Sequence, residues 1–133
     1  MHTTNYQDTL ILPSPDCPVN SATIPAKPGT VAALQHGKLA AAPYGMTSDD
    51  LVFGIYAERK GLVEEETGAA RMEFFSKGQP CLRSSPLVKT LGWALHHDSD
   101  GRVALVDPAS TEFDELLARP DITKRSGLRS KRA

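Results

Sequence analysis

Hydrophobic residues recur every three to four positions along much of the chain, which is the spacing of a helix with one apolar face. Polar residues that cap helices mark where several of these stretches begin. Thr47, followed three residues later by Asp50, forms a capping-box pattern, and Gly61 ends the helix that it starts. The sequence predicts helices over residues 30–41, 47–60, 64–77, 85–91 and 107–119.

Three other stretches alternate apolar and polar residues, as a half-buried strand does. They cover residues 6–12, 93–97 and 102–106. Residues 98–101 join the last two stretches into a hairpin, because Gly101 tolerates a positive φ in the turn. We expect the first strand to pair with this hairpin, and residues 122–128 are a candidate for a further strand.

In the first strand, Tyr6 and Leu10 are expected on one side and Ile11 on the other, since successive side chains of a strand alternate. Short strands beside longer helices, with one clear hairpin, indicate an α+β fold. The expected architecture is a small antiparallel sheet that includes the C-terminal hairpin, with the helices packed on one face.

Length and composition fit a single domain over residues 1–133. The 133 residues are 40% hydrophobic, which is enough to bury a core without a metal or a disulfide. Five prolines between residues 13 and 28 predict an irregular surface loop, because proline fixes φ and removes a backbone donor. Loops of this length are often functional.

The net charge of −1 is spread unevenly along the chain. Residues 121–133 hold five cations against Asp121, a net charge of +4, so the remaining residues carry −5. This basic tail could fold back on the acidic body or dock a protein partner. So few cations beside an acidic body argue against a nucleic-acid-binding module.

The first residues are polar and lack the basic and apolar regions of a signal peptide. No apolar stretch approaches the length of a membrane span. We therefore expect a soluble, cytoplasmic protein that does not associate with membranes. In a reducing compartment, Cys17 and Cys81 are expected as free thiols and not as a disulfide.

The connection between the third and fourth predicted helices carries the most candidate chemistry. Lys77 and Arg83 supply cations, Ser84 and Ser85 supply hydroxyls, and the next helix begins at once. The first N–H groups of a helix are free and electropositive, which suits a phosphate or a carboxylate. The sequence therefore suggests an anion site on these four residues. The alternative is ordinary helix capping by the serines.

Cys81 lies between Lys77 and Arg83, and positive neighbours favour the reactive thiolate. His96 or His97 could serve as its base if the hairpin packs beside this connection. The alternative is that Cys81 is a small buried hydrophobe, because free cysteines are among the most buried residues.

The two neighbouring histidines point to opposite faces of their strand, so they are unsuited to binding one metal ion together. His97 shares its side with Trp93 and Leu95 and is expected at the edge of the core, whereas His96 shares its side with Ala94. No spacing typical of a zinc site is present, and we expect neither a metal nor a cofactor.

Five blocks resemble, in order, an uncharacterised bacterial family of small single-domain proteins. The blocks are MHTTNY at 1–6, TSDD at 47–50, FFSKGQPCLR at 74–83, GWALHHD at 92–98 and RSKRA at 129–133. The resemblance runs from end to end and implies a single domain of unknown function. It implies no catalytic residue, because the family carries no assigned activity.

The function is therefore undefined by the sequence, and three hypotheses stay open. The leading hypothesis is a domain that binds a small anionic ligand at the connection that contains Arg83, with Trp93 and Tyr56 as apolar walls. The second is a thiol-dependent enzyme that uses Cys81 and a histidine. The third is an interaction module that docks a partner through the basic tail. No motif decides whether the protein is an enzyme.

Overall fold

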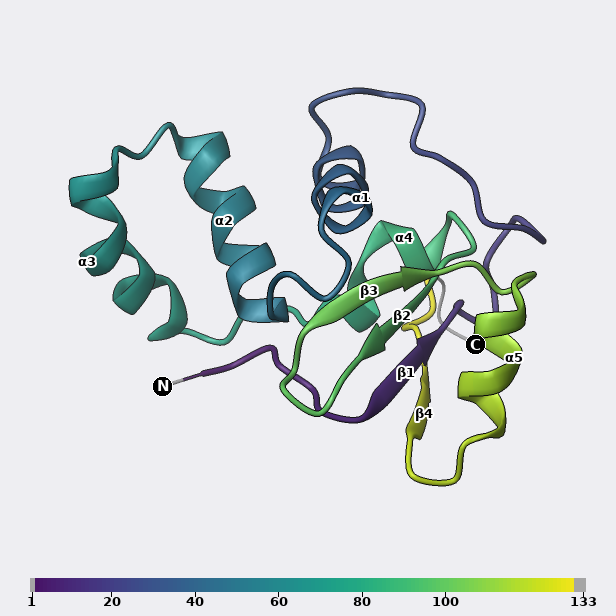
Figure 1. The fold of residues 1–133 in the computed structure, drawn as a ribbon. Helices are drawn as coiled ribbons and strands as arrows, with labels where there is room; N and C mark the ends of the chain where they lie inside the picture. Colours follow the sequence, from purple (N-terminus) through teal and green to yellow (C-terminus); the bar gives the residue numbers. More distant parts are fainter. Residues whose placement is uncertain (1, 131–133) are drawn as a thin grey trace.

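A four-stranded sheet lies at the centre of the molecule (Figure 1). The computed structural model describes residues 2–130. The strands lie in the order β3-β2-β1-β4, and they are β1 (Thr9–Leu12), β2 (Ala94–His97), β3 (Val103–Val106) and β4 (Thr123–Ser126). The expected hairpin is the pair β2–β3, and the first strand pairs with it as predicted. The α+β class is confirmed.

The sheet is mixed, so the expectation of an antiparallel sheet is wrong for one strand. β1 and β2 pair antiparallel, as do β2 and β3, but β4 runs parallel to β1. The reason lies in the connection that precedes β4. Between β3 and β4 the chain crosses the sheet through helix α5 (Thr111–Ala118), and a helical crossover returns the chain in its original direction.

The first four predicted helices begin within a residue of their predicted starts, but the last does not: residues 107–110 form a turn, and Ser110 caps α5 at Thr111. The other helices are α1 (Val31–Ala41), α2 (Ser48–Lys60), α3 (Glu64–Phe75), the 3-10 helix η1 (Leu82–Ser84) and α4 (Pro86–Lys89). Thr47 accepts from Asp50 N and the Asp50 carboxylate accepts from Thr47 N, so the capping box at the start of α2 is complete. Gly61 ends α2 with a φ of 68°, a left-handed conformation that glycine adopts without strain.

Helices cover both faces of the sheet, and not one face as expected. On the first face, Ile11, Leu95 and Val103 pack against buried residues of α1, α2, η1 and α4. On the second face, Leu10 and Val106 pack against residues of α5 and the segment that follows it, Leu116 and Ile122. The amphipathic α5 thus closes the side of the sheet that the other helices leave open.

Tyr6 lies on the opposite side of the first strand from the one predicted. Its ring packs with the cluster that contains Ile11, whereas Leu10 belongs to the cluster on the other face. The strand pattern is interrupted at Asp8, which has a φ of 47°. A left-handed residue within an extended segment reverses which side the preceding residues face. This reversal brings the Tyr6 ring to the face on which His97 lies.

The helices α2 and α3 extend away from the sheet as a hairpin (Figure 1). Phe75 is the only residue of α3 that is buried. Phe74 packs against Phe53 and Tyr56 of α2, with ring centroids 5.7 and 4.6 Å apart. Aromatic contacts between the two helices therefore hold α3, which makes no hydrophobic contribution to the sheet clusters.

The proline-rich stretch at 13–28 forms neither helix nor strand, yet several backbone contacts hold it to the body. Ser14 N donates to Val88 O, and Thr23 N donates to Leu91 O, each at 2.8 Å. Gly92 has a φ of 77°, and a Cβ there would lie 2.6 Å from the Ser21 carbonyl oxygen. The residue before Trp93 is therefore glycine because the loop packs directly on its backbone.

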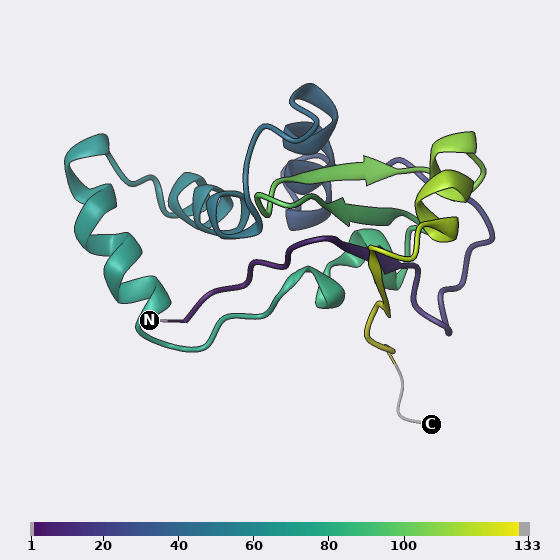
Figure 2. The same cartoon turned by 60° about the horizontal axis from the view of Figure 1, so that its bottom comes forward.

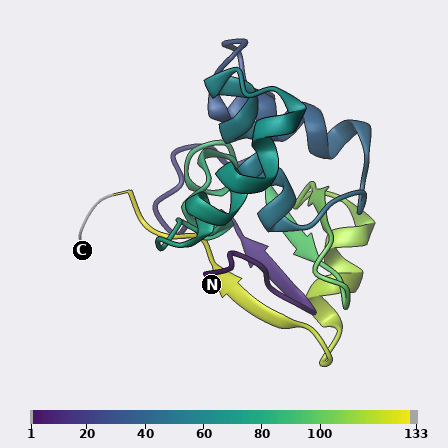
Figure 3. The same cartoon turned by 90° about the vertical axis from the view of Figure 1, so that its left-hand side faces the viewer.

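The basic tail adds β4 at the edge of the sheet, beside β1 (Figure 3). Beyond β4, Leu128 N donates to the Arg83 carbonyl at 2.7 Å, and Ser130 N donates to the Asp16 carboxylate at 2.9 Å. Backbone hydrogen bonds therefore dominate the attachment of the described part of the tail. Residues 131–133, which carry two of its cations, lie outside the described residues.

Candidate functional site

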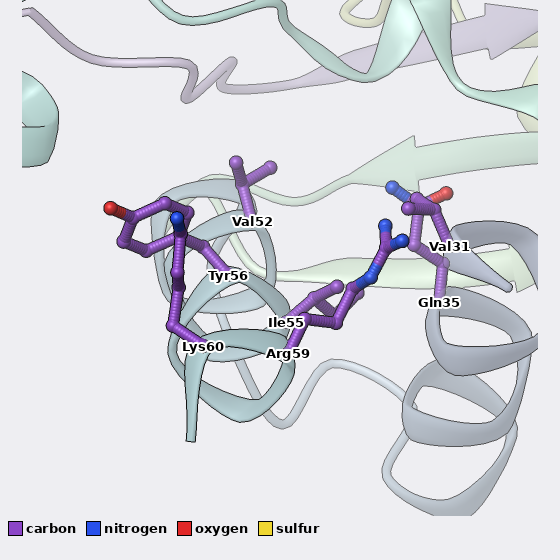
Figure 4. Close-up of a pocket in the computed structure, with 7 residues that line it drawn as sticks. All are labelled: Val31, Gln35, Val52, Ile55, Tyr56, Arg59 and Lys60. Atoms are coloured by element: carbon purple, nitrogen blue, oxygen red, sulfur yellow. The ribbon is translucent and has the colours of Figure 1, made fainter. Parts of the chain in front are cut away.

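A cavity of about 470 Å³ opens between α1 and α2 (Figure 4). Its lining combines an apolar floor with polar groups, and consists of Val31 and Gln35 from α1 and Val52, Ile55, Tyr56, Arg59 and Lys60 from α2. The α2 residues recur at three- to four-residue spacing, so one stripe of that helix faces the opening. In Figure 4 the Arg59 side chain extends from α2 toward Gln35 of α1.

A second cavity of about 190 Å³ lies beside the first, at the connection that precedes α4. The two share Val31, Gln35 and Val52, and the second adds residues of the connection, namely Pro80, Cys81, Leu82, Ser84 and Ser85. We call the two cavities together the α1/α2 groove. Its first cavity is lined by the exposed cations near the end of α2, and its second by Cys81.

The two cations of the groove lack carboxylate partners among the described residues. Arg59 and Lys60 are both exposed, and neither takes part in an ion pair within residues 2–130. The neighbouring acid, Glu58, is already paired with Lys38 at 3.2 Å. The Lys60 ammonium lies 5.9 Å from the Tyr56 ring centroid. The positive charge at this end of the groove is therefore available to a ligand.

Gln35 places an amide donor inside the groove. The residue is 6% exposed, and its Oε1 accepts a hydrogen bond of 2.6 Å from the Ser85 hydroxyl. The Ser85 hydroxyl in turn accepts from Leu87 N and so caps α4. The Gln35 Nε2 has no hydrogen-bond partner within residues 2–130, and Figure 4 shows it on the side of Arg59. An amide N–H without a protein partner at a cavity wall can donate to an acceptor in that cavity.

The four residues of the predicted anion site are not assembled around one point. Ser84 donates to the Cys81 carbonyl at 2.7 Å, and Ser85 is engaged with Gln35 as described. Arg83 Nε donates to the Ser126 carbonyl at 2.8 Å and so holds β4. Lys77 is exposed and does not line the groove. At the start of α4, Pro86 has no N–H, and the N–H groups of residues 87–89 all donate to Ser85, so none is left for an anion.

Only one of the two residues predicted as apolar walls lines the groove. Tyr56 lines the groove, as the hypothesis requires. Trp93 does not line it: its indole Nε1 donates to the Thr23 carbonyl at 2.8 Å and its ring lies 5.3 Å from the His36 ring. Trp93 therefore packs the proline-rich stretch onto the body.

Cys81 has a tyrosine and not a histidine as its side-chain partner. Its Sγ lies 3.2 Å from the Tyr6 hydroxyl, and no histidine of the described chain hydrogen-bonds to it. Cys17 and Cys81 are both free thiols, and both are half-buried. Figure 2 shows the N-terminal residues running beside the connection from α3 to η1, which is the contact that brings Tyr6 to Cys81.

His97 is completely buried, and not at the edge of the core as expected. It is 0% exposed, and neither ring nitrogen has a hydrogen-bond partner among the described residues. Burial, reinforced by the neighbouring His96, lowers the pKa of His97 from 6.5 to about 4. The ring packs edge-on against Tyr6, with centroids 5.4 Å apart. His97 is therefore neutral near pH 7.

His96 lies on the other face of the sheet, as predicted from the alternation of the strand. Its Nδ1 hydrogen-bonds to the Tyr44 hydroxyl at 2.7 Å. Burial lowers the pKa of His96 and, with the help of Glu112, raises the pKa of Tyr44 to about 12. A role of either histidine as a base for Cys81 stays a prediction without a direct contact to support it.

The described residues contain no group of three His, Cys, Asp or Glu side chains placed to hold a metal ion. Within the same residues, no helix has the length and the apolar character that crossing a membrane requires.

Sequence reasoning missed the residues that dominate the groove. Arg59 and Lys60 continue the stripe begun by Val52, Ile55 and Tyr56, so the helical spacing contained the signal on α2. Nothing in the sequence pairs that stripe with Gln35 on α1. Gln35 joins the α2 residues only because the fold packs α1 beside α2.

The fold and the groove define the class: a small α+β domain with a ligand-sized groove beside its sheet. The chain belongs to a family of unknown function, DUF6157, whose profile matches residues 1–133. The expected resemblance to an uncharacterised single-domain family is thereby confirmed. No curated protein and no solved structure matches the chain.

Proposed function

We propose that the protein binds a small organic anion with an apolar body in the α1/α2 groove. The proposal keeps the leading hypothesis of a small anionic ligand, but assigns the binding of its charge to Arg59 and Lys60 instead of Lys77 and Arg83. The supporting observation is an apolar cavity of about 470 Å³ whose rim carries Arg59 and Lys60 without carboxylate partners. Pockets of this size are typical of sites for small molecules, which are mostly apolar with a few polar groups.

Each part of the groove has a separate task in this proposal. Val31, Val52 and Ile55 receive the apolar body, because burying apolar surface is favourable. The Arg59 guanidinium receives the carboxylate, since its planar fork matches two carboxylate oxygens. The Gln35 Nε2 offers one further donor to an acceptor group deeper in the groove.

A titration with octanoate, followed by two-dimensional amide NMR, tests the proposal. We expect resonances of α1 and α2 around the groove to shift and saturate. Arg59→Gln should weaken binding about tenfold or more, because a hydrogen bond to a charged group is worth about 1.5–3 kcal/mol. Arg102→Gln, at an exposed arginine beside β3, is the matched control. Octylamine should not compete, since it carries the same charge as the rim.

The same titration discriminates between this groove and the site suggested by the sequence. If Arg83→Gln weakens binding of octanoate or inorganic phosphate while Arg59→Gln does not, the ligand is held by the connection before α4. Equal affinities in Arg59→Gln, Arg102→Gln and the wild type would contradict a role of the groove cations.

A further inference from the structure

The strand β4 forms an edge of the sheet whose outward backbone groups are largely unused. At the opposite edge, the segment before α2 bonds to β3: Tyr44 N donates to the Val103 carbonyl at 3.0 Å, and Val103 N donates to the Met46 carbonyl at 2.9 Å. Within residues 2–130, β4 pairs with β1 alone. Figure 3 shows β4 along the outer border of the sheet. An open strand edge can accept one more strand.

The ladder between β1 and β4 determines which backbone groups of β4 point outward. Thr123 N donates to the Asp8 carbonyl at 2.8 Å. Further along the same strand pair, Gly127 N donates to the Leu12 carbonyl, also at 2.8 Å. The odd-numbered residues of β4 therefore turn their backbone groups toward β1, and the even-numbered residues turn theirs away, because backbone groups alternate along a strand.

Most of the outward groups of β4 are available to a partner. The N–H and the carbonyl of Lys124 and the N–H of Ser126 have no hydrogen-bond partner within residues 2–130. The Ser126 carbonyl is already used, because it accepts from Arg83 Nε at 2.8 Å. An antiparallel strand opposite Lys124 uses all the open groups, since a hydrogen-bonded pair exchanges two bonds and the next such pair lies two residues away.

The charge along this edge is positive, and no carboxylate of the described residues pairs with it. Lys124 and Arg125 lie in β4 itself and Arg83 lies beside it, and none of the three takes part in an ion pair within residues 2–130. The acid just before the strand, Asp121, is paired with Arg119 at 2.6 Å. A second copy of β4 placed against this edge brings cations against cations, which destabilises a strand pair. The edge therefore disfavours self-association and favours an acidic segment.

We propose that β4 docks an extended acidic segment of another protein, which adds to the sheet as a further strand. The backbone of the segment pairs with the open groups of Lys124 and Ser126, and its carboxylates meet the cations along the edge. In strand addition of this kind, main-chain hydrogen bonds give affinity and side chains give specificity. The surface is separate from the α1/α2 groove, so the inference does not rest on the proposed function. It assigns a partner chemistry to the basic tail.

The test titrates the wild-type protein with the acetylated and amidated peptide Glu-Val-Glu-Val-Glu-Val and follows the backbone amides by two-dimensional NMR. We expect the resonances of β4 to shift and saturate, and the Lys124 and Ser126 amides to exchange more slowly with solvent because they become hydrogen-bonded. The same peptide with lysine in place of glutamate should bind more weakly. A peptide with every backbone nitrogen methylated keeps the charge without the donors, and should not bind. Equal binding of the methylated peptide would leave charge attraction alone and overturn strand addition.

A charge reversal tests the specificity of the edge. Arg125→Glu should weaken binding of the acidic peptide about fivefold, and should bind the lysine peptide more tightly than the wild type does, because opposite charges across a strand pair attract and like charges repel. Arg102→Glu makes the same charge change at an exposed arginine just before β3, at the other edge of the sheet, and should leave both affinities nearly unchanged. Equal effects of the two substitutions would overturn the inference.

Ser126→Pro removes one open N–H and leaves the cations in place. It should bind the acidic peptide about fivefold more weakly, the factor that loss of one backbone hydrogen bond gives. If this variant does not fold, the methylated peptide still tests the backbone pairing on the wild type. Other occupants leave distinct signatures. Shifts of the β4 amides with protein concentration alone would identify a second copy as the occupant, and peptide-induced shifts in α1 and α2 would place the peptide at the groove. Either result would contradict the docking of an acidic strand on β4.

Discussion

The sheet and the α2–α3 hairpin are built on different physical principles. All four residues of β2 are buried, and both faces of the sheet are covered by helices. In α3 only Phe75 is buried, Met72 is 66% exposed, and Val63, just before the helix, is 55% exposed. The free energy of folding is therefore concentrated in the sheet, whereas α3 depends on a few aromatic contacts. Segments with few buried contacts open at a lower free energy than the whole domain.

The α1/α2 groove lies on the border between these two regions. α2 contributes Leu51 and Ile55 to the core of the sheet, while the exposed Tyr56, Arg59 and Lys60 lie next to Ile55 on the stripe that lines the groove. The groove is therefore lined by helices that the core anchors, and none of its lining residues belongs to the less buried α3. Changes made in each region separately can therefore test the contrast.

The largest contrast is expected between core truncations in the two regions. Leu95→Ala in β2 removes a side chain that is 0% exposed, and should lower the free energy of unfolding by about 2–5 kcal/mol. Met72→Ala in α3 should change it by less than about 0.5 kcal/mol, because that side chain is exposed. Denaturant titrations of both variants give the two values. Similar losses for the two would show that α3 shares in the global stability.

A second contrast concerns His97, a fully buried histidine of β2 whose burial disfavours its protonated form. Its pKa in the folded protein, about 4, is below the usual 6.5, so the unfolded chain binds more protons between these values. Its contribution to stability is present above pH 6.5 and is lost as the pH falls toward 4. The loss amounts to about 3 kcal/mol at most, since one pKa unit is worth about 1.4 kcal/mol.

Replacing the imidazole with an apolar side chain isolates this effect. His97→Leu removes both unpartnered ring nitrogens, so the free energy of unfolding should fall less steeply between pH 6.5 and 4 than in the wild type. Urea titrations at closely spaced pH values measure the slope. An unchanged slope in His97→Leu would assign the acid sensitivity between pH 6.5 and 4 to another group, such as His96, whose pKa is also lowered by burial.

Local features of the sequence predicted local features of the structure well. The Thr47–Asp50 capping box depends on four consecutive residues, and the β2–β3 hairpin depends on its own turn, so both could be recognised directly. The side on which Tyr6 lies could not, because nothing in its sequence neighbourhood marks Asp8 as left-handed. Non-glycine residues rarely adopt that conformation.

Features that depend on distant segments were predicted poorly, for a physical reason. The parallel direction of β4 follows from the path of α5 across the sheet, and no local pattern contains that path. The groove needs Gln35 and Arg59 from different helices, so neither residue alone indicates a site. The hydroxyls of Ser84 and Ser85 looked available in the sequence, but the fold uses both within the protein.

The smallest and most local contrast is between the caps of the two helices in the hairpin. Thr47 caps α2 through its hydroxyl, whereas Val63 at the start of α3 has no side-chain acceptor, and only the Glu66 carboxylate accepts from its N–H. Thr47→Ala should cost about 1 kcal/mol. That loss should appear in global unfolding, because the helix that it caps contributes Leu51 to the core.

Val63→Ser supplies the missing acceptor and should stabilise α3 by a similar amount, about 0.5–1 kcal/mol. Because α3 is held apart from the sheet, the gain should slow hydrogen exchange of the α3 amides and leave the midpoint of global unfolding nearly unchanged. Val63→Ala is the matched control, since it shortens the side chain without adding an acceptor. If Val63→Ser instead raises the global midpoint as strongly as Thr47→Ala lowers it, α3 unfolds together with the sheet. The contrast between the two regions would then be one of exposure and not of stability.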